Sequence, residues 1–137
     1  MATKKKSWVE KRDSCKAPHV TVIDKAFAGI PAGSKLLISS PLEIDQYVRG
    51  IPKGTQMDPA EMRRALARRH QVDATCPVST GIFLRIVAEA ALEDYRAGQP
   101  LAAIAPFWRL ISPSSALFKK LSIGRDEYDV IKNLAGE

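Results

Sequence analysis

The sequence predicts a mainly α, winged-helix-like single domain with minor β structure and an extended N-terminal arm. Three segments with helix-start signals or helical apolar spacing follow one another over residues 41–97, as in a helix-turn-helix. The length of 137 residues suits one hydrophobic core and is short for two domains. We therefore divide the chain into a basic arm, residues 1–38, and a helix-turn-helix domain, residues 39–137.

The predicted arm shows little helical periodicity and is interrupted by proline and glycine. Residues 19–23 and 35–38 are short β-branched or aliphatic runs that either pair as small strands or lie on the domain surface. Residues 1–16 hold six Lys and Arg against two acidic residues, which is +4 of the net charge of +6. Such a tail either wraps a nucleic acid electrostatically or is only solvated.

The net charge of +6 favours a polyanionic partner such as nucleic acid. No segment has the length and hydrophobicity of a signal peptide or a membrane span, so we expect a cytoplasmic protein without membrane association. We also expect the protein to be a monomer. Cys15 and Cys76 form no CxxC pair, so we expect reduced thiols, no structural metal and no cofactor.

The first domain helix is predicted to begin at Pro41. Ser40 is a capping residue, proline suits the first helical position, and Glu43 completes a capping-box pattern. The helix should end near Arg49, before the turn at residues 50–54. The side chains expected to be buried are Leu42, Tyr47 and Val48 or Ile51.

The second helix is predicted over residues 59–70, with Asp58 as its cap, Pro59 as its first residue and Glu61 three residues beyond the cap. Its buried stripe is expected to be Met62, Ala65 and Leu66. Its other faces carry the arginines Arg63, Arg64, Arg68 and Arg69. These arginines either contact phosphates or form a solvated helix face, and the helix-turn-helix order keeps both interpretations open.

The third helix is predicted to begin at Ser79 and Thr80 and to end near Gly98. Its apolar face is expected to be Ile82, Phe83, Ile86, Val87, Ala90 and Ala91. Ser79, Thr80 and Arg85 are candidate groove contacts if the start of this helix enters DNA. In the structural alternative, which we favour, Ser79 or Thr80 caps the helix and Arg85 pairs with Glu89.

Residues 101–111 are apolar but interrupted by proline, which predicts a short buried strand or an irregular segment. The cluster Pro106, Phe107, Trp108 and Arg109 is a candidate base-receiving pocket, with aromatic rings for stacking and a cation beside them. Alternatively, the aromatic rings pack in the core and the arginine makes a structural ion pair, which we favour because large aromatic residues are mostly buried. Residues 115–120 and 125–134 predict two short terminal helices.

Four features in this order resemble the DNA-binding domain of DNA alkylguanine alkyltransferases and alkyltransferase-like proteins over about residues 41–134. They are the Ile51-Pro52-Lys53-Gly54 turn, the helix with Glu61 and Ala65-Leu66, the helix from residue 79, and Pro106-Phe107-Trp108-Arg109-Leu110. The resemblance implies a helix-turn-helix that binds DNA. It also implies a Pro-Cys-His-Arg motif with a reactive cysteine.

The departures from this family remove its chemistry. Phe107 stands at the position of the reactive cysteine and Trp108 at that of the activating histidine, so the resemblance implies no alkyl transfer. Pro59 and Thr80 fall near the tyrosine and arginine that the family uses to flip a base. The resemblance thus implies a non-enzymatic DNA-binding protein that recognises an alkylated base in duplex DNA and leaves repair to a partner protein.

Two other functions remain open. The chain is an interaction or regulatory module if the Phe107–Trp108 region or the arm binds protein instead of DNA. It is an enzyme if Cys76, placed just before a helix N-terminus where a thiolate is stabilised, acts as a displaced nucleophile. We rank this last possibility below the others, because a buried, inert cysteine is the ordinary case.

Overall fold

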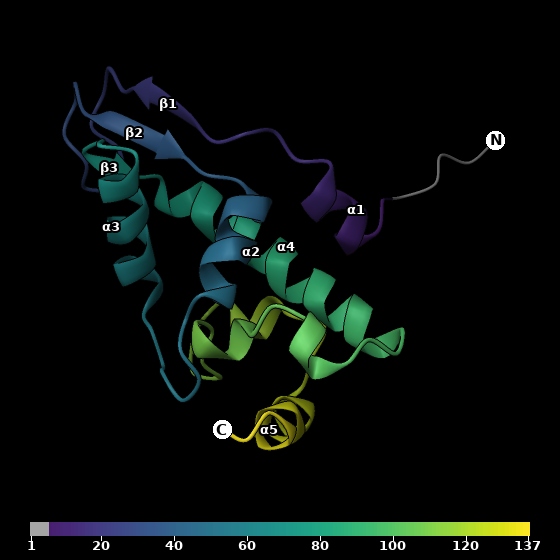
Figure 1. Cartoon of the computed structure of the whole chain (residues 1–137). Coiled ribbons are helices and arrows are strands. Elements are labelled where there is room, and N and C mark those ends of the chain that lie inside the picture. The colour runs from purple at the N-terminus through teal and green to yellow at the C-terminus, as the bar shows by residue number, and fades with distance from the viewer. Residues whose placement is uncertain (1–5) are drawn as a thin grey trace.

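The structure, a computed structural model, describes residues 6–137 and forms one small domain (Figure 1). The described residues contain the helices α1 (Trp8–Asp13), α2 (Pro41–Arg49), α3 (Pro59–Arg69), α4 (Pro77–Arg96) and α5 (Arg125–Leu134). They also contain the 3₁₀ turns η1 (Leu101–Ala103), η2 (Phe107–Arg109) and η3 (Phe118–Lys120), and the strands β1 (His19–Val22), β2 (Lys35–Ile38) and β3 (Ala74–Thr75). A mainly α domain with minor β structure is therefore confirmed.

The sheet joins the predicted arm to the domain. β1 pairs with β2 antiparallel, with Val20 opposite Leu37, and β2 pairs with β3 in parallel. Leu37 is fully buried, whereas every residue of β1 is exposed. The alternative in which residues 19–23 and 35–38 pair as strands is confirmed, and the domain boundary at residue 38 is wrong because β2 belongs to the same core as the helices.

The expectation of an extended arm is also wrong at α1. Ser7 caps this helix in a full capping box with Glu10, the same pattern that marks the later helices. α1 lies along α4: the backbone N–H of Trp8 donates to Glu93 Oε2 (2.7 Å), and Arg12 Nη1 lies 3.4 Å from Asp94 Oδ2. Of the basic residues in the predicted arm, Lys4 and Lys5 lie outside the described residues.

α2 begins and ends as predicted, with Ser40 Oγ accepting from the Glu43 N–H. The Glu43 carboxylate does not close a capping box but binds elsewhere, accepting from Ser39 Oγ (2.6 Å) and lying 2.7 Å from His70 Nε2. The side chains that α2 and the following turn bury are Ile44, Val48 and Ile51. The predicted burial of Leu42 is wrong, because a residue two positions from Ile44 points to the opposite side of a helix.

α3 forms over nearly its predicted range, but Ala65 of its predicted buried stripe is only half-buried and Ala67 is buried instead. Asp58 caps it by accepting from the N–H of Ala60 (2.7 Å), and Met62 and Leu66 are fully buried. Thr75 Oγ1 donates to the backbone oxygen of Arg63 (2.8 Å) and so ties the helix to β3. The helix is therefore held in place by its buried apolar side chains and by a hydrogen bond to its backbone.

α4 runs through the middle of the molecule (Figure 1) and begins at Pro77, two residues before the predicted start. Of its predicted apolar face, Val87, Ala90 and Ala91 are buried as expected, whereas Ile82 is exposed and Phe83 and Ile86 are only half-buried. Leu84, Ala88 and Leu92 complete the buried face. Glu89 is buried and accepts from the N–H and hydroxyl of Ser122 (3.1 and 2.7 Å), so the predicted Arg85–Glu89 pair is wrong.

The C-terminal third closes the core beneath α2 and α4. Residues 101–111 form η1 and η2, so the irregular alternative is right and the strand is not formed. The helix predicted over residues 115–120 is reduced to η3, whereas α5 forms as expected. The Tyr128 hydroxyl of α5 donates to the backbone oxygens of Trp108 (3.1 Å) and Ile111 (2.8 Å), and burial raises the pKa of Tyr128 to about 12. In residues 6–137, no helix combines the length and the apolar character that crossing a membrane requires.

Candidate nucleic-acid interface

The four arginines of α3 form the most concentrated cationic surface on one helix. Arg64, Arg68 and Arg69 are exposed and Arg63 is half-buried. None of the four forms an ion pair with a described residue. Met62 is fully buried on the side of α3 opposite Arg64 and Arg68, so these two guanidinium groups project from a helix that is anchored in the core.

Two of these arginines meet the start of α4. Arg63 and Arg64 line a hollow of about 300 Å³ together with Asp73, β3 and Pro77, the first residue of α4. We call it the α3 hollow. Asp73 Oδ2 accepts from the Lys35 N–H (2.8 Å), so its carboxylate faces β2 as well as the hollow. The two guanidinium groups outnumber this single carboxylate, which leaves the α3 hollow suited to an anion.

The first half of α4 lines a second, larger hollow of about 570 Å³, which we call the α1–α4 hollow. Its walls come from three parts of the chain: Trp8 and Lys11 of α1, Val78, Gly81, Ile82, Arg85 and Ile86 of α4, and Ala116, Leu117 and Lys120 of the loop before α5. Val78 and Ile82 are 56% and 57% exposed, unusual for aliphatic residues on a central helix. The start of α4 thus presents apolar side chains between two cationic hollows.

The three candidate contacts on α4 have different fates. Thr80 is buried and its hydroxyl donates to the backbone oxygen of Cys76 (2.6 Å), so it neither reaches a groove nor caps the helix. Ser79 Oγ is also buried, without a hydrogen-bond partner among the described residues. Arg85 lines the α1–α4 hollow, with its guanidinium carbon 5.3 Å from the Trp8 ring centre. Only Arg85 is placed to contact a ligand.

The aromatic pair of η2 belongs to the core. Phe107 is fully buried and packs edge-to-face against Trp108, with the ring centres 5.4 Å apart. Trp108 is 2% exposed, and its Nε1 donates to Glu137 Oε2 (2.7 Å). The structural interpretation of these two residues is confirmed, and the prediction that Phe107 provides a stacking surface for a base is wrong because no part of its ring is accessible.

Arg109 is likewise a structural residue. Its guanidinium donates to both carboxylate oxygens of Glu137 and to the backbone oxygen of Ile51 (2.8 Å). Glu137 also accepts from the backbone N–H of Gly54 (2.9 Å), at the turn before α3. Burial alone would raise the pKa of Glu137, but hydrogen bonds from Arg109, Gly54 and Trp108 lower it to about 2. We call these groups the Glu137 cluster.

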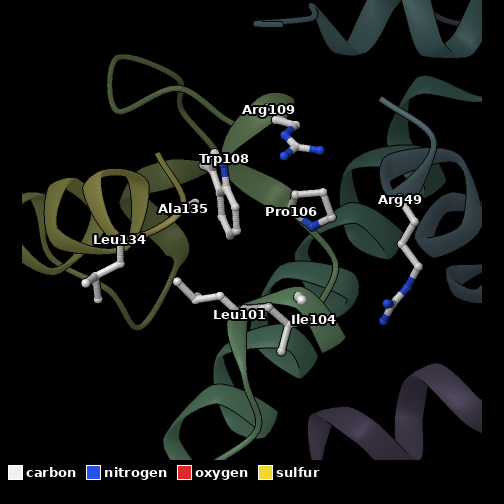
Figure 2. A pocket seen from close by; sticks show the side chains of 9 residues that line it. Arg49, Leu101, Ile104, Pro106, Trp108, Arg109, Leu134 and Ala135 are labelled. Atoms are coloured by element: carbon white, nitrogen blue, oxygen red, sulfur yellow. The ribbon is translucent and has the colours of Figure 1, made fainter. Parts of the chain in front are cut away.

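Pro106, Trp108 and Arg109 do line a hollow, although not one for a stacked base. This α5 hollow, of about 410 Å³, lies between η1, η2 and the end of α5 (Figure 2). Figure 2 shows the Trp108 ring, Pro106 and Leu101 around it, with Leu134 and Arg49 at its edges. The Arg49 guanidinium donates to Asp45 Oδ2 (2.8 Å) and to the backbone oxygen of Ala103 (3.1 Å). No thiol, hydroxyl or imidazole lines this hollow, so it can hold an apolar group but offers no nucleophile.

Cys76 is buried in the folded chain. It is 6% exposed at the N-cap of α4, and its N–H donates to the backbone oxygen of Leu37 (2.9 Å). A thiol enclosed in this way cannot approach an alkyl carbon without local unfolding. Within residues 6–137, no group of three or more metal-ligating side chains is close enough to hold a metal ion.

Comparison of the chain with protein-family models, curated proteins and solved structures finds no match. The resemblance to the alkyltransferase domain therefore rests on the motif residues quoted above.

Of the residues that line the α1–α4 hollow, only Arg85 was among the predicted site residues, and the aromatic and cationic residues that sequence reasoning missed are Trp8, Lys11 and Lys120. Trp8 and Lys11 come from α1, and the Ser7–Glu10 capping box was the sequence signal for that helix. Lys120 comes from η3, which reaches α4 only in the folded chain, and no local pattern links these two segments. The cationic surface is therefore larger than the helix-turn-helix alone.

Proposed function

We propose that this protein binds duplex DNA without altering it chemically, through α3 and the start of α4. The observation that carries the proposal is the row of α3 arginines, free of ion pairs with described residues, two of which meet the first residue of α4 in the α3 hollow. Guanidinium groups bind phosphate oxygens in a forked geometry, and such contacts supply most of the affinity of DNA-binding proteins.

We assign α2, α3 and α4 to a helix-turn-helix of winged-helix type, with the β1–β2 hairpin as the wing. The three helices follow in the predicted order, and β3 places the hairpin next to α3. In such a unit a helix enters a groove while neighbouring elements hold the phosphates.

The resemblance to alkyltransferase-like proteins adds a preference for an altered base. Phe107 replaces the nucleophile and is buried, so the proposed role is recognition, with repair left to a partner protein. Val78 and Ile82 are exposed at the start of α4. Proteins that bind the minor groove often insert apolar side chains between base steps, and we propose that role for these two residues. We propose that the protein acts as a monomer and that it acts in the cytoplasm.

Changing Arg63, Arg64, Arg68 and Arg69 together to glutamine is expected to weaken duplex DNA binding about tenfold or more at moderate salt. Each lost phosphate contact should reduce the slope of log affinity against log salt by about 0.9. The measurement is fluorescence anisotropy over a salt series, with duplexes that carry either guanine or O6-alkylguanine. Tighter binding of the alkylated duplex is the result expected for lesion recognition.

The matched control removes four cations elsewhere: Lys53, Lys119, Arg125 and Lys132, all changed to glutamine. Both variants have the same net charge, so a general electrostatic effect would weaken binding equally. Equal loss in the two variants, or no salt-sensitive binding by the unchanged protein, contradicts the proposal.

A second candidate function is protein binding at the α5 hollow. Leu134 is 64% exposed at its edge, next to the apolar surface of Leu101 and Trp108. We expect Leu134→Glu to abolish association with a partner that inserts an apolar side chain there, and Val130→Glu on the same helix but outside the hollow to leave it intact. Co-purification of tagged variants from cells, after nuclease treatment, measures this. Partner recovery that does not differ between the two variants would exclude the α5 hollow.

A further inference from the structure

The largest hollow described above, between α1, α4 and the segment before α5, shares Val78 and Ile82 with the DNA proposal, but Trp8, Lys11 and Lys120 in its lining play no part in that proposal. Its volume of about 570 Å³ falls in the range of small-molecule sites, about 300–1,000 Å³. It is roughly twice the volume of the α3 hollow, and one wall is α1, which lies outside the helix-turn-helix. The hollow can be judged on its own chemistry.

The floor of the hollow is apolar. Ile82 and Val78 of α4 are more than half exposed, and Ile86 and Leu117 complete the surface. Exposed aliphatic side chains next to one another in a concave surface gain free energy when a ligand covers them, because apolar area leaves water. The floor therefore favours a ligand with an apolar body.

The rim of the hollow is cationic. Lys11, Arg85 and Lys120 line it, and no aspartate or glutamate does. None of the three forms an ion pair with a described residue. The Arg85 guanidinium donates no hydrogen bond within residues 6–137, and its Nε is buried without an acceptor. The rim is therefore complementary to an anionic group.

Trp8 is held in place as a rigid wall. Its backbone N–H donates to the Glu93 carboxylate. Lys11 Nζ lies over its ring, 4.3 Å from the ring centre, and the Arg85 guanidinium lies close to the same ring. These cation–π contacts keep both cations beside the hollow and do not neutralise them. The hollow is thus preformed, which reduces the entropy lost on binding.

We propose that the α1–α4 hollow binds a small amphipathic anion, a molecule with an apolar body and one carboxylate, sulfonate or phosphate group. The apolar body covers Ile82 and Leu117, and the anionic group lies between Arg85 and Lys120. This site is distinct from the α3 hollow and does not depend on DNA binding.

The probe for the site is the dye 8-anilinonaphthalene-1-sulfonate, which joins an aromatic body to one sulfonate. The full chain should bind one dye molecule with enhanced emission, and dodecanoate should displace it. Arg85→Gln and Lys120→Gln should each weaken dye binding about tenfold, because each removes a charge-assisted contact. Amide chemical shifts of the folded protein should change at Ile82, Arg85 and Leu117 and not at Ile131 in the core.

Lys119→Gln is the matched control, because Lys119 neighbours Lys120 but does not line the hollow. Equal dye affinity in the Lys119 and Lys120 variants would overturn the proposal, as would equally tight binding of the uncharged analogue N-phenyl-1-naphthylamine. Displacement of the dye by a short DNA duplex but not by dodecanoate would also overturn it and assign the hollow to the nucleic-acid surface. Circular dichroism confirms that each surface variant remains folded.

Discussion

The Phe107→Ala variant should lose about 3–5 kcal/mol of its free energy of unfolding, the cost of removing a fully buried phenylalanine. The ring packs edge-to-face on Trp108, so the deletion leaves a cavity and also removes an aromatic contact. Chemical denaturation followed by far-ultraviolet circular dichroism measures the change. An effect of this size would show that Phe107 maintains the fold.

Phe27→Ala provides the control of the same residue type. Phe27 is 41% exposed, so we expect its replacement to cost about 1 kcal/mol or less. If the two alanine variants were equally stable, the side chain of Phe107 would have to face an open pocket in solution, and the base-receiving interpretation would return.

Replacing Glu137 by glutamine should lower the free energy of unfolding by about 3 kcal/mol at neutral pH, because it leaves the Arg109 guanidinium buried without its counter-charge. The Glu137 side chain is only 4% exposed and accepts hydrogen bonds from three residues in two separate parts of the chain, Gly54 before α3 and Trp108 and Arg109 of η2. Glu127→Gln is the control: Glu127 pairs with Arg96 on the surface, where a salt bridge contributes about 1 kcal/mol at most.

The same variant makes a pH prediction. The folded pKa of Glu137, about 2, lies below its ordinary value of 4.5, so the ionised carboxylate stabilises the folded chain. This stabilisation is complete above the ordinary value and is lost as the pH falls from 4.5 toward 2. The difference in unfolding free energy between the unchanged protein and Glu137→Gln should therefore shrink over this interval. A difference that stays constant down to pH 2 would contradict the assigned role.

Local signals predicted most of the helices. Ser40 and Asp58 each lie before a proline at the first helical position, and both caps are formed as expected. α1 has the same kind of cap at Ser7, but at six residues it is too short to show an apolar stripe, and none of its residues is buried. Its stability comes from contacts with α4, 80 residues away in the chain, which no local pattern records.

The orientation of α4 was the hardest feature to predict. Ile82, Phe83 and Ile86 make a convincing apolar face in the sequence, yet Ile82 is exposed while Glu89 is buried. Glu89 tolerates burial because Ser122 supplies two hydrogen bonds from a distant loop. The phase of a helix that is apolar on several sides is thus decided by its tertiary partners.

The candidate site was likewise only partly predictable from the sequence. The exposure of Arg64 and Arg68 follows from helical spacing once Met62 and Leu66 are placed in the core, whereas Arg69 lies on the same face as Met62 and is exposed at the last residue of the helix. The walls of the α1–α4 hollow do not follow in this way, because Trp8, Arg85 and Lys120 come from three remote segments. The helix that carries the cations was predictable, whereas the cavity was not.

The parallel pairing of β2 with β3 has a consequence for how the chain assembles. Because α2 and α3 separate β2 from β3 in the chain, the two strands cannot form a local hairpin. We expect them to pair only after both helices have packed against the core. β3 has only two residues, and its flanking amides, those of Asp73 and Cys76, donate to β2. Hydrogen exchange at these two amides that is faster than exchange in the core would mark a pairing that forms late and opens locally, and such an opening would uncouple the arginines of α3 from α4 while the core stays intact.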